Sequence, residues 1–466
     1  MTARARAIAA LAGVAVAAGL WWALDSGPPG RPNIVLVVWD TCRADRLSAY
    51  GYGKRTTPWL EEFARDAVLY QEAFSPSPWT PPAHASLFTG LLPRNHGLQH
   101  GRGDRIPKGI PLLAETLRAS GYETVGFTSN AYISGITGLN AGMDRFVSLH
   151  SDASGIGTAE QVEEAVEAWL LERRNRPSEQ NRRPLFVFFN LMDAHLPRRP
   201  FPEDLQAILG SAAVPAGVAR ALRIDQREAV AHLLKVRELD AETLAGMGPV
   251  YDAAVRHLDR KTRDLFERMR EDGILEDAVI AVTGDHGEHL GEHGNLSHQM
   301  SLHDPVLRIP MVVRWPGRLE GGRIERAQVR LQDLHPTLLE AAGLAPPPGT
   351  AKDAVPLTES PLKPRLHRAS FARPIPFLPE ARKEYAGAPE SVFHRFQISI
   401  RAVQEPTLGA GSRKYLSYER GDGVAPPTLD REELFDLASD PREERNLLAA
   451  PSDGDRAAAE RLRPMR

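Results

Sequence analysis

The sequence has a single cysteine, Cys42, in 466 residues. An intrachain disulfide framework is therefore impossible, and a zinc site built from several cysteines is excluded. An excess of charge of one sign is also lacking, because 57 Lys and Arg against 60 Asp and Glu leave a net charge of −3. No overall field would attract nucleic acid, which we do not expect as a partner.

Long uncharged apolar runs are scarce, and the first lies at the N-terminus. Arg4 and Arg6 precede an apolar run over residues 7–24, which a Gly- and Pro-rich segment follows. This pattern predicts an export signal or a marginal membrane anchor, because a full span needs about 20 apolar residues. No small-residue cleavage site precedes Asp25, which favours an anchor. We expect a protein that is periplasmic or anchored to the outer face of a bacterial inner membrane.

Three apolar runs of strand length follow along the chain. They are NIVLVVW at 33–39, LFVFFNL at 185–191 and DAVIAVTG at 277–284. Continuous runs of this kind are typical of strands buried on both faces of a parallel sheet. Helical spacing at 57–67 and 158–174 adds a βαβ alternation. The sequence therefore predicts an α/β fold with a large, mostly parallel sheet sandwiched by helices, and a smaller C-terminal antiparallel-sheet subdomain.

Shifts in composition suggest the domain boundaries. We expect a signal peptide or anchor with its linker at 1–32, a catalytic domain at 33–345, a Pro-rich linker or loop at 346–390, a small α+β subdomain at 391–450 and a tail at 451–466. Residues 201–247 are polar, helical in tendency and without a motif, and are expected to form a lid or an insertion over the site.

The stretch SPSPWTPPAHASLFTGLLPRNHG, at 75–97, contains a hydroxyl in an unusual place. Thr80 stands directly before two prolines, which set φ for the first turn of a helix, and a run that can continue a helix follows. The hydroxyl is therefore expected at a helix N-terminus, where backbone N–H groups favour an anion. A nucleophile and a positive field would then coincide.

Acidic residues end two of the predicted strands. Asp40 follows the first, and Asp285 and His286 follow the run at 277–284. Ligands bind outside the carboxyl ends of strands in open α/β sheets, so these side chains are expected to meet. With Thr80 they form a set of three oxygen donors and one nitrogen donor for one divalent metal ion, which could be calcium, manganese or zinc.

The stretch at 75–97 resembles the signature segment of the sulfatase family, in the alkaline phosphatase superfamily. The matching positions are Thr80, Pro82, Ala83, His84, Leu87, Thr89, Gly90, Pro93, His96 and Gly97. Three of them differ from the family pattern. Thr80 replaces the residue that sulfatases oxidise to formylglycine, Ala83 replaces serine and His84 replaces arginine. The resemblance implies the same metal positions as above, with Thr41 in place of a further acidic ligand.

Other motifs carry the same resemblance. The loop MDAHLPRRP resembles the family's segment that supplies a substrate-facing histidine, here His195, and HQMSLHDPVLRIP places His298 at a position that contacts the ester or its leaving group. The segment ELFDLASDPREERNLL resembles the family's C-terminal hairpin. The resemblance covers about residues 33–448. A second match, CRADR at 42–46, mimics the formylglycine recognition core but lacks its continuation, and we interpret it as a decoy.

These residues suggest a mechanism in which Thr80 attacks a metal-bound sulfuryl or phosphoryl centre. His84, His195 and His298 would hold the oxyanion or protonate the leaving oxygen. A formylglycine hydrate can expel sulfate by breaking its own carbon–oxygen bond, whereas a threonine ester must be released by attack at sulfur or phosphorus. Phosphorus accepts that attack more readily, which favours a phosphate mono- or diester over a sulfate ester.

Several alternatives stay open at this point. The chain could transfer a phosphoryl group to an acceptor, or it could be a non-catalytic, membrane-anchored binding protein on the same fold. The expected substrate is a small-molecule, lipid or glycan ester, whose leaving group the sequence does not identify. The oligomeric state is left open.

Overall fold

A computed structural model describes residues 30–100, 103–150, 157–177, 181–406, 412–421 and 427–465. Most of the N-terminal segment expected as a signal or anchor lies outside these residues. None of the helices within the described ranges is both long and apolar enough to cross a membrane.

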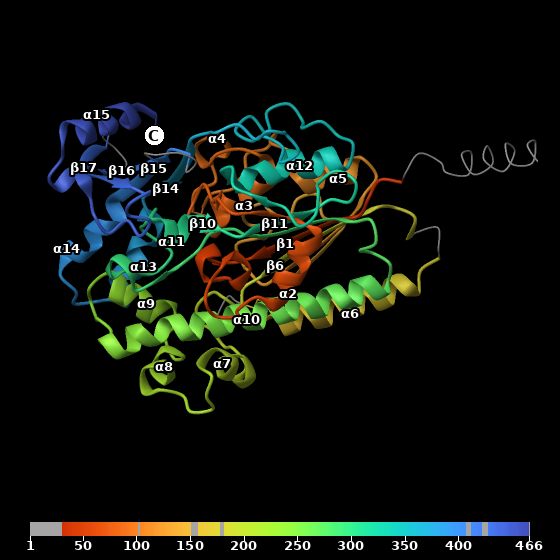
Figure 1. The fold of residues 1–466 in the computed structure, drawn as a ribbon, viewed down its shortest axis with the longest axis horizontal. Coiled ribbons are helices and arrows are strands. Elements are labelled where there is room, and N and C mark those ends of the chain that lie inside the picture. The colour runs from red at the N-terminus through yellow and green to blue at the C-terminus, as the bar shows by residue number, and fades with distance from the viewer. Residues whose placement is uncertain are drawn as a thin grey trace, which may run out of the picture.

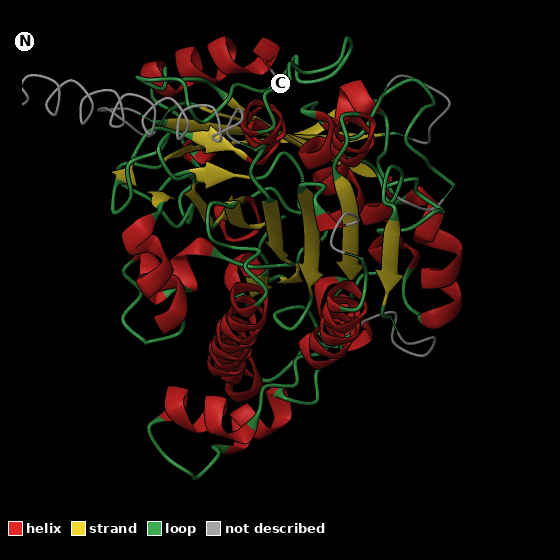
Figure 2. Cartoon of the chain, turned by 90° about the vertical axis from the view of Figure 1, so that its right-hand side faces the viewer, coloured by secondary structure: helices red, strands yellow, loops and turns green. Residues whose placement is uncertain are grey.

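The core is one eight-stranded sheet whose middle strands are parallel (Figure 2). Its order is β12 (Ile324–Glu325), β2 (Val68–Tyr70), β11 (Met311–Arg314), β7 (Val279–Gly284), β1 (Ile34–Trp39), β6 (Leu185–Leu191), β4 (Glu123–Thr128) and β5 (Arg145–Ser148). The strands from β7 to β5 run parallel, and β11 is antiparallel to both of its neighbours. The predicted fold class, a mostly parallel sheet with helices, is confirmed.

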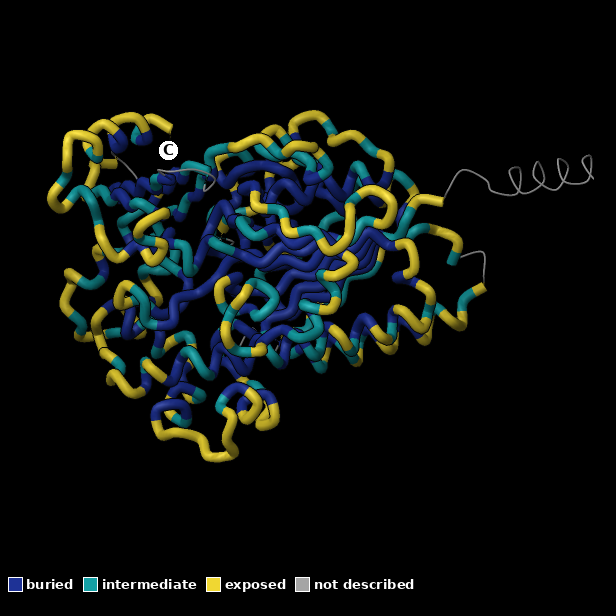
Figure 3. The backbone as a smooth tube through the Cα atoms, viewed as in Figure 1, coloured by how far each residue is buried: buried dark blue, intermediate teal, exposed yellow. Residues whose placement is uncertain are grey.

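Helices cover both faces of this sheet (Figure 1). One face carries α2 (Pro58–Phe63), α6 (Ala159–Arg174) and α10 (Ala241–Glu271), and the other carries α3 (Thr80–Thr89), α5 (Leu113–Ala119) and α12 (Leu334–Ala341). The side chains of successive β1 residues pack alternately into the apolar clusters on the two faces of the sheet. Val35 and Val37 belong to one cluster and Leu36 to the other. Each such side chain contributes about 1.5–3 kcal/mol when fully buried, and Figure 3 shows the buried strands at the centre.

The segment expected to cover the site lies elsewhere for most of its length. It forms α7 (Pro202–Leu209), α8 (Ala216–Ala221) and α9 (Gln226–Leu233). Helices α7 and α8 pack on α10, because Leu205, Ile208 and Val218 join the apolar cluster of that layer. Only α9 reaches towards the site, where the Gln226 amide donates to Ser297 Oγ at 2.9 Å.

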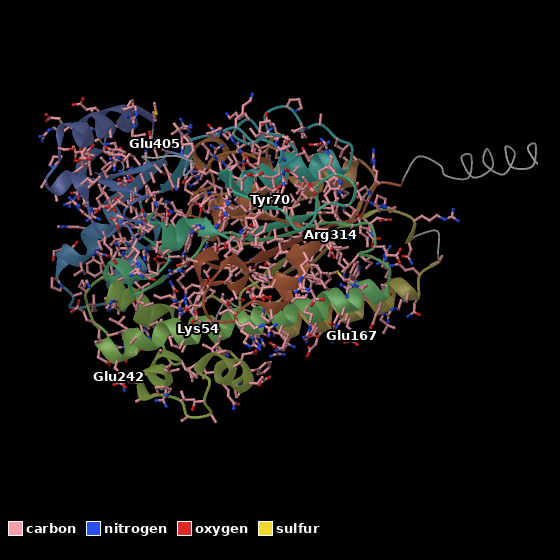
Figure 4. The ribbon with its side chains drawn as sticks, in the orientation of Figure 1. Lys54, Tyr70, Glu167, Glu242, Arg314 and Glu405 are labelled. Atoms are coloured by element: carbon pink, nitrogen blue, oxygen red, sulfur yellow. The ribbon has the colours of Figure 1, made fainter. Side chains whose placement is uncertain are left out.

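The C-terminal part is a four-stranded antiparallel sheet packed against the main body (Figure 1). Its strands are β14 (His367–Phe371), β15 (Ile398–Gln404), β16 (Arg413–Arg420) and β17 (Thr428–Asp436). Helix α15 (Asp453–Leu462) covers one face of this sheet. Arg461 of that helix forms an ion pair with Glu405, which is labelled in Figure 4. This sheet begins earlier than expected, since β14 lies inside the segment interpreted as a linker.

Short elements join the two parts. They are β3 (Ala73–Phe74), β10 (Arg308–Ile309), β13 (Val329–Arg330), the hairpin of β8 (His289–Leu290) and β9 (Leu296–Ser297), and helices α4 (Pro93–His96), α11 (Asp304–Leu307), α13 (Leu378–Glu384) and α14 (Glu390–Phe393).

Candidate active site

Two carboxylates and an imidazole meet at the carboxyl ends of β1 and β7. One ligand atom from each of Asp40, Asp285 and His286 lies within 4.8 Å of the others, and all three residues are buried. Asp40 Oδ1 and Asp285 Oδ2 have no hydrogen-bond partner among the described residues. Burial, and after it the charge of Asp40, raises the pKa of Asp285 well above its usual value. Two buried, unpartnered carboxylate oxygens beside an imidazole fit a divalent cation.

The imidazole of His286 is oriented for ligation. Its Nδ1 lies 3.1 Å from the carbonyl oxygen of Gly287, so Nδ1 carries the proton and donates it. Nε2 therefore presents a lone pair, 3.3 Å from Asp285 Oδ2 and 4.0 Å from Asp40 Oδ1. Burial lowers the pKa of His286 to about 4, which keeps the ring neutral. A neutral imidazole with its second nitrogen hydrogen-bonded is the usual form of a metal-binding histidine.

The turn after β1 holds these ligands in register. Thr41 has a φ of 56°, and its N–H donates to Asp285 Oδ1 at 3.2 Å. The Tyr251 hydroxyl, from α10, donates to the carbonyl of Thr41 at 2.7 Å and accepts from the N–H of Arg43 at 2.9 Å. A β-branched residue in the left-handed region is strained, and such strain persists only where the surroundings impose it.

Thr80 is the first residue of α3, and its hydroxyl faces the candidate metal-binding group. Oγ1 lies 3.3 Å from His286 Nε2, and the Asn130 amide donates to it at 3.4 Å. The expectation that backbone N–H groups would hold an anion here is wrong. Pro81 and Pro82 have no N–H, and the N–H of Ala83 already donates to the carbonyl of Trp79 at 3.1 Å.

Two asparagines that the sequence analysis missed complete the site. Asn130 follows β4 and Asn190 lies in β6, and both amides donate to Asp40 Oδ2, at 3.0 and 3.1 Å. They orient the carboxylate so that Oδ1 faces Asp285 and His286. The position of each at the carboxyl end of an apolar strand was the available signal, but no motif marks an isolated asparagine.

His84 lies behind the site. Its ring is buried between Phe88 and Phe188, and Nδ1 lies 3.1 Å from the carbonyl of Thr80 and 3.5 Å from Asp285 Oδ2. Burial lowers the pKa of His84 to about 4. The ring lies beside the Asp285 carboxylate without a hydrogen bond to it, and its expected role at the oxyanion or leaving oxygen stays a prediction.

His195 and His298 lie together on another side of the site. The His298 ring is 4.4 Å from the His286 ring and 5.4 Å from the His195 ring, between centroids. His298 Nδ1 donates to the carbonyl of Pro78 at 2.8 Å, and its Nε2 is buried without a partner in the described chain. Trp79 packs on the same histidine, 5.4 Å between centroids. The structure thus places His298 beside His286, and His195 beside His298.

Cys42, from the motif interpreted as a decoy, is fully buried in the layer beneath the sheet. Burial, followed by the charge of Asp285, raises the pKa of its thiol well above the usual value. The thiol is therefore kept protonated, and a modifying enzyme could not reach it in the folded protein.

The fold and this buried carboxylate–imidazole group beside a hydroxyl define a candidate metal-dependent ester-cleaving site. The chain belongs to the sulfatase family, whose model matches residues 32–344. The resemblance found in the sequence is thereby confirmed.

Two curated relatives and one solved structure illustrate the similarity. An ulvan-active sulfatase of Formosa agariphila is 25% identical, over 68% of this chain and 53% of that protein, so the chain spans about half the length of that relative. A choline-sulfatase of Rhizobium meliloti is 24% identical, over 94% of this chain and 86% of that protein. The crystal structure of a phosphonate monoester hydrolase of Agrobacterium radiobacter matches with a TM-score of 0.65 and 19% identity, covering 93% of this chain and 94% of that one.

Proposed function

We propose that the protein is an exported hydrolase that cleaves a phosphate mono- or diester by attack of Thr80. The observation that carries the proposal is the Thr80 hydroxyl, at a helix start, 3.3 Å from the imidazole of a buried ligand group. Asp40, Asp285 and His286 would hold one divalent ion, with Thr80 as a fourth donor. When bound, the ion neutralises non-bridging oxygens and lowers the pKa of the threonine hydroxyl.

The side chains around Thr80 supply the remaining chemistry. Asn130 Nδ2 donates towards Thr80 Oγ1, so it can also donate to an oxygen of a group bound there. In the first step Thr80 Oγ1 bonds to phosphorus, the bond from phosphorus to the leaving oxygen breaks, and the Thr80 proton passes to that oxygen. His298, whose Nδ1 proton is committed to Pro78, can relay this proton through Nε2. In the second step water attacks phosphorus and releases Thr80. Thr80 is only 3% exposed, which keeps bulk water from the nucleophile.

Threonine as the nucleophile favours a phosphate ester. A threonine ester cannot eliminate its group as a formylglycine hydrate can, and phosphorus is attacked more readily than sulfur. A sulfate ester is the second candidate, favoured by membership of the sulfatase family and by relatives that include an ulvan-active sulfatase and a choline-sulfatase. The same names support a glycan or a small molecule as the alcohol portion. Transfer to an acceptor other than water uses the same first step.

Replacing Thr80 tests the proposal. Thr80→Ala should change the free energy of unfolding by less than about 1 kcal/mol, yet reduce turnover of an aryl phosphate by about three orders of magnitude or more. Thr80→Ser should retain part of the rate, and Cys42→Ala is the matched control that should retain most of it. Acid quench during turnover should trap a phosphoryl adduct on the peptide containing Thr80, detected by mass spectrometry.

Two results would overturn the assignment. One is full activity in Thr80→Ala. The other is an oxidised Cys42 on which activity depends, which would restore a formylglycine mechanism and favour sulfate esters. Parallel assays with aryl phosphate, phosphodiester and sulfate substrates, each with added Mn²⁺, Zn²⁺ or Ca²⁺, rank the ester classes directly.

A further inference from the structure

A cavity of about 560 Å³ lies at the amino ends of the parallel strands, at the end of the sheet opposite to the candidate active site. Asn33, directly before β1, and Pro184, directly before β6, line it. The end of α6 and the turn after α10 form its rim, at the edge that carries the first described residues (Figure 1). The charged side chains that line it are Arg31, Arg173, Arg174, Arg182, Arg183 and Asp272.

This cavity is called the basic pocket, because five of its six charged lining residues are arginines. Three of these arginines form ion pairs, with Asp272, Asp144 and Glu123. Glu123 is shared with a further arginine, Arg176, which lies 2.7 Å from it. The five lining arginines and Arg176 are thus paired with three carboxylates, and these pairs leave three positive charges unbalanced.

Two guanidinium groups of the basic pocket are available to a ligand. Arg31 and Arg182 are both exposed, and neither forms an ion pair with a described residue. One nitrogen of Arg31 donates to the carbonyl of Ser120, which holds this side chain at the pocket and leaves its other N–H groups for a ligand. A guanidinium group presents its donors in a planar fork that matches the oxygens of a phosphate group. The basic pocket therefore suits a phosphate-bearing anion.

The predicted membrane anchor ends close to the basic pocket in the sequence. Its apolar run, residues 7–24, lies outside the described residues, and only residues 25–30 separate this run from Arg31. Six residues span about 20 Å at most when fully extended. An apolar run held in a bilayer would therefore keep the basic pocket within reach of the lipid headgroups, where each basic side chain is attracted to anionic lipid.

We propose that the basic pocket binds the phosphodiester headgroups of anionic phospholipids in the membrane that holds the N-terminal segment. The attraction is local, because the net charge of the whole chain is −3 and gives no general preference for an anionic surface. A few unbalanced charges bind a membrane only weakly without an anchor, so the pocket orients the anchored protein rather than recruiting it. The proposal needs residues 7–24 to be an anchor, but it does not depend on turnover at Thr80.

Energy transfer from a fluorophore beside the basic pocket to a headgroup-labelled lipid tests this docking in the full-length protein. Ala119→Cys, exposed at the end of α5, carries the fluorophore, because the natural Cys42 is fully buried. The protein is reconstituted in phosphatidylcholine vesicles that contain either about 30% phosphatidylglycerol or none. Transfer should be higher with phosphatidylglycerol at low salt, and high salt should remove the gain.

Substitutions in the basic pocket locate the effect. Arg31→Ala with Arg182→Ala should lower the ratio of docked to undocked protein about tenfold or more in the anionic vesicles. Arg326→Ala with Arg442→Ala removes the same charge from two exposed positions elsewhere and should change this ratio by less than about twofold. A melting curve checks the fold of the double variant. Arg182→Ala alone, which keeps the bond from Arg31 to Ser120, should still lower the ratio severalfold.

Equal transfer in the two kinds of vesicle, or equal losses in the two pairs of variants, would overturn the proposal. Loss of docking on addition of inorganic phosphate at constant ionic strength would replace the membrane with a soluble anion as the occupant. A full-length protein that neither kind of vesicle retains would remove the anchor, and the proposal with it. Hydrolysis of a small aryl phosphate should be unchanged in the pocket variants. A wild-type protein inactive on every small ester would count against the proposed function and leave the docking result intact.

Discussion

Asp40 and Asp285 are unfavourable neighbours unless a cation lies between them. Both are fully buried, and their unpartnered oxygens face the same small space as His286 Nε2. The Asn130 and Asn190 amides satisfy one oxygen of Asp40 and leave the other available. The raised pKa of Asp285 expresses this cost, because protonation is the other way to remove the repulsion. A divalent ion held between the two carboxylates would remove the same repulsion without protonation.

Asp285→Asn should therefore abolish metal binding. We expect the purified wild-type protein to contain about one divalent ion per chain by mass spectrometry of the metal, and the variant to contain far less. Metal at about 100 times its Kd should stabilise the wild type by about 2.7 kcal/mol, seen as a higher Tm that a chelator removes. Asp264→Asn, which changes an ion pair on the surface of α10, is the control. A wild-type protein whose Tm ignores Ca²⁺, Mn²⁺ and Zn²⁺ would contradict the site.

Four residues of the candidate site were predictable from the sequence: Asp40, Thr80, Asp285 and His286. Each lies at the end of an apolar strand or the start of a helix, and the carboxyl ends of parallel strands meet at one edge of the sheet. It misjudged the donors around Thr80. The paired prolines that predict the helix start also remove the N–H groups that would have held an anion. The amide of Asn130 takes that place across 50 residues of sequence, and no local pattern encodes such a contact.

At the scale of elements, His257 on α10 joins three other segments. Its Nε2 lies 2.9 Å from Glu160 Oε1, at the start of α6, and 3.7 Å from Asp193 Oδ1, in the loop that carries His195. Its Nδ1 lies 3.2 Å from Asp204 Oδ2, on α7. Hydrogen bonds to Asp204 and Glu160 outweigh burial and raise the pKa of His257 to about 9. The protonated ring thus ties the long helix to the loop beside the active site.

This histidine should make stability depend on pH. Because its pKa is about 9 when folded and about 6.5 when unfolded, its contribution is fully present below about pH 6.5 and is lost as the pH rises to about 9. The loss should be on the order of 3 kcal/mol, measured by urea unfolding across that range. His257→Gln should flatten the profile, whereas His394→Gln, at an exposed position, should not. An unchanged profile in His257→Gln would show that another group titrates.

The elements themselves were predictable in proportion to their length. β1, β6 and β7 appear as continuous apolar runs because both of their faces are buried. β3 has two residues and β14 lies among prolines, so neither has a local signal, and long-range pairing alone defines them. The same reason explains why the C-terminal sheet begins earlier than its composition suggested.

At the scale of the whole molecule, the candidate site and the start of the first strand lie at opposite ends of the main sheet. The carboxyl ends of β1 and β7 carry the candidate metal-binding group, and the first described residues lie at the opposite end of the sheet. There the Asn33 side chain donates to the carbonyl of Ile274 at 2.9 Å and accepts from the N–H of Leu185 at 2.9 Å. Arg314, labelled in Figure 4, caps the same end by donating to the carbonyl of Glu276.

Removing residues 1–29 should release a soluble protein with unchanged ester hydrolysis, because the first bonds of the sheet begin at Asn33 and the site lies at the other end. The full-length protein should sediment with membranes after expression, and the shortened one should not. Removing residues 1–33 is the matched comparison. It also deletes the Asn33 side chain and leaves the N–H of Leu185 without its partner, which should cost about 1–3 kcal/mol of stability. A folded but inactive protein after the shorter deletion would place the N-terminal segment in the site, and a full-length protein found in the cytosol would contradict the export and the anchor.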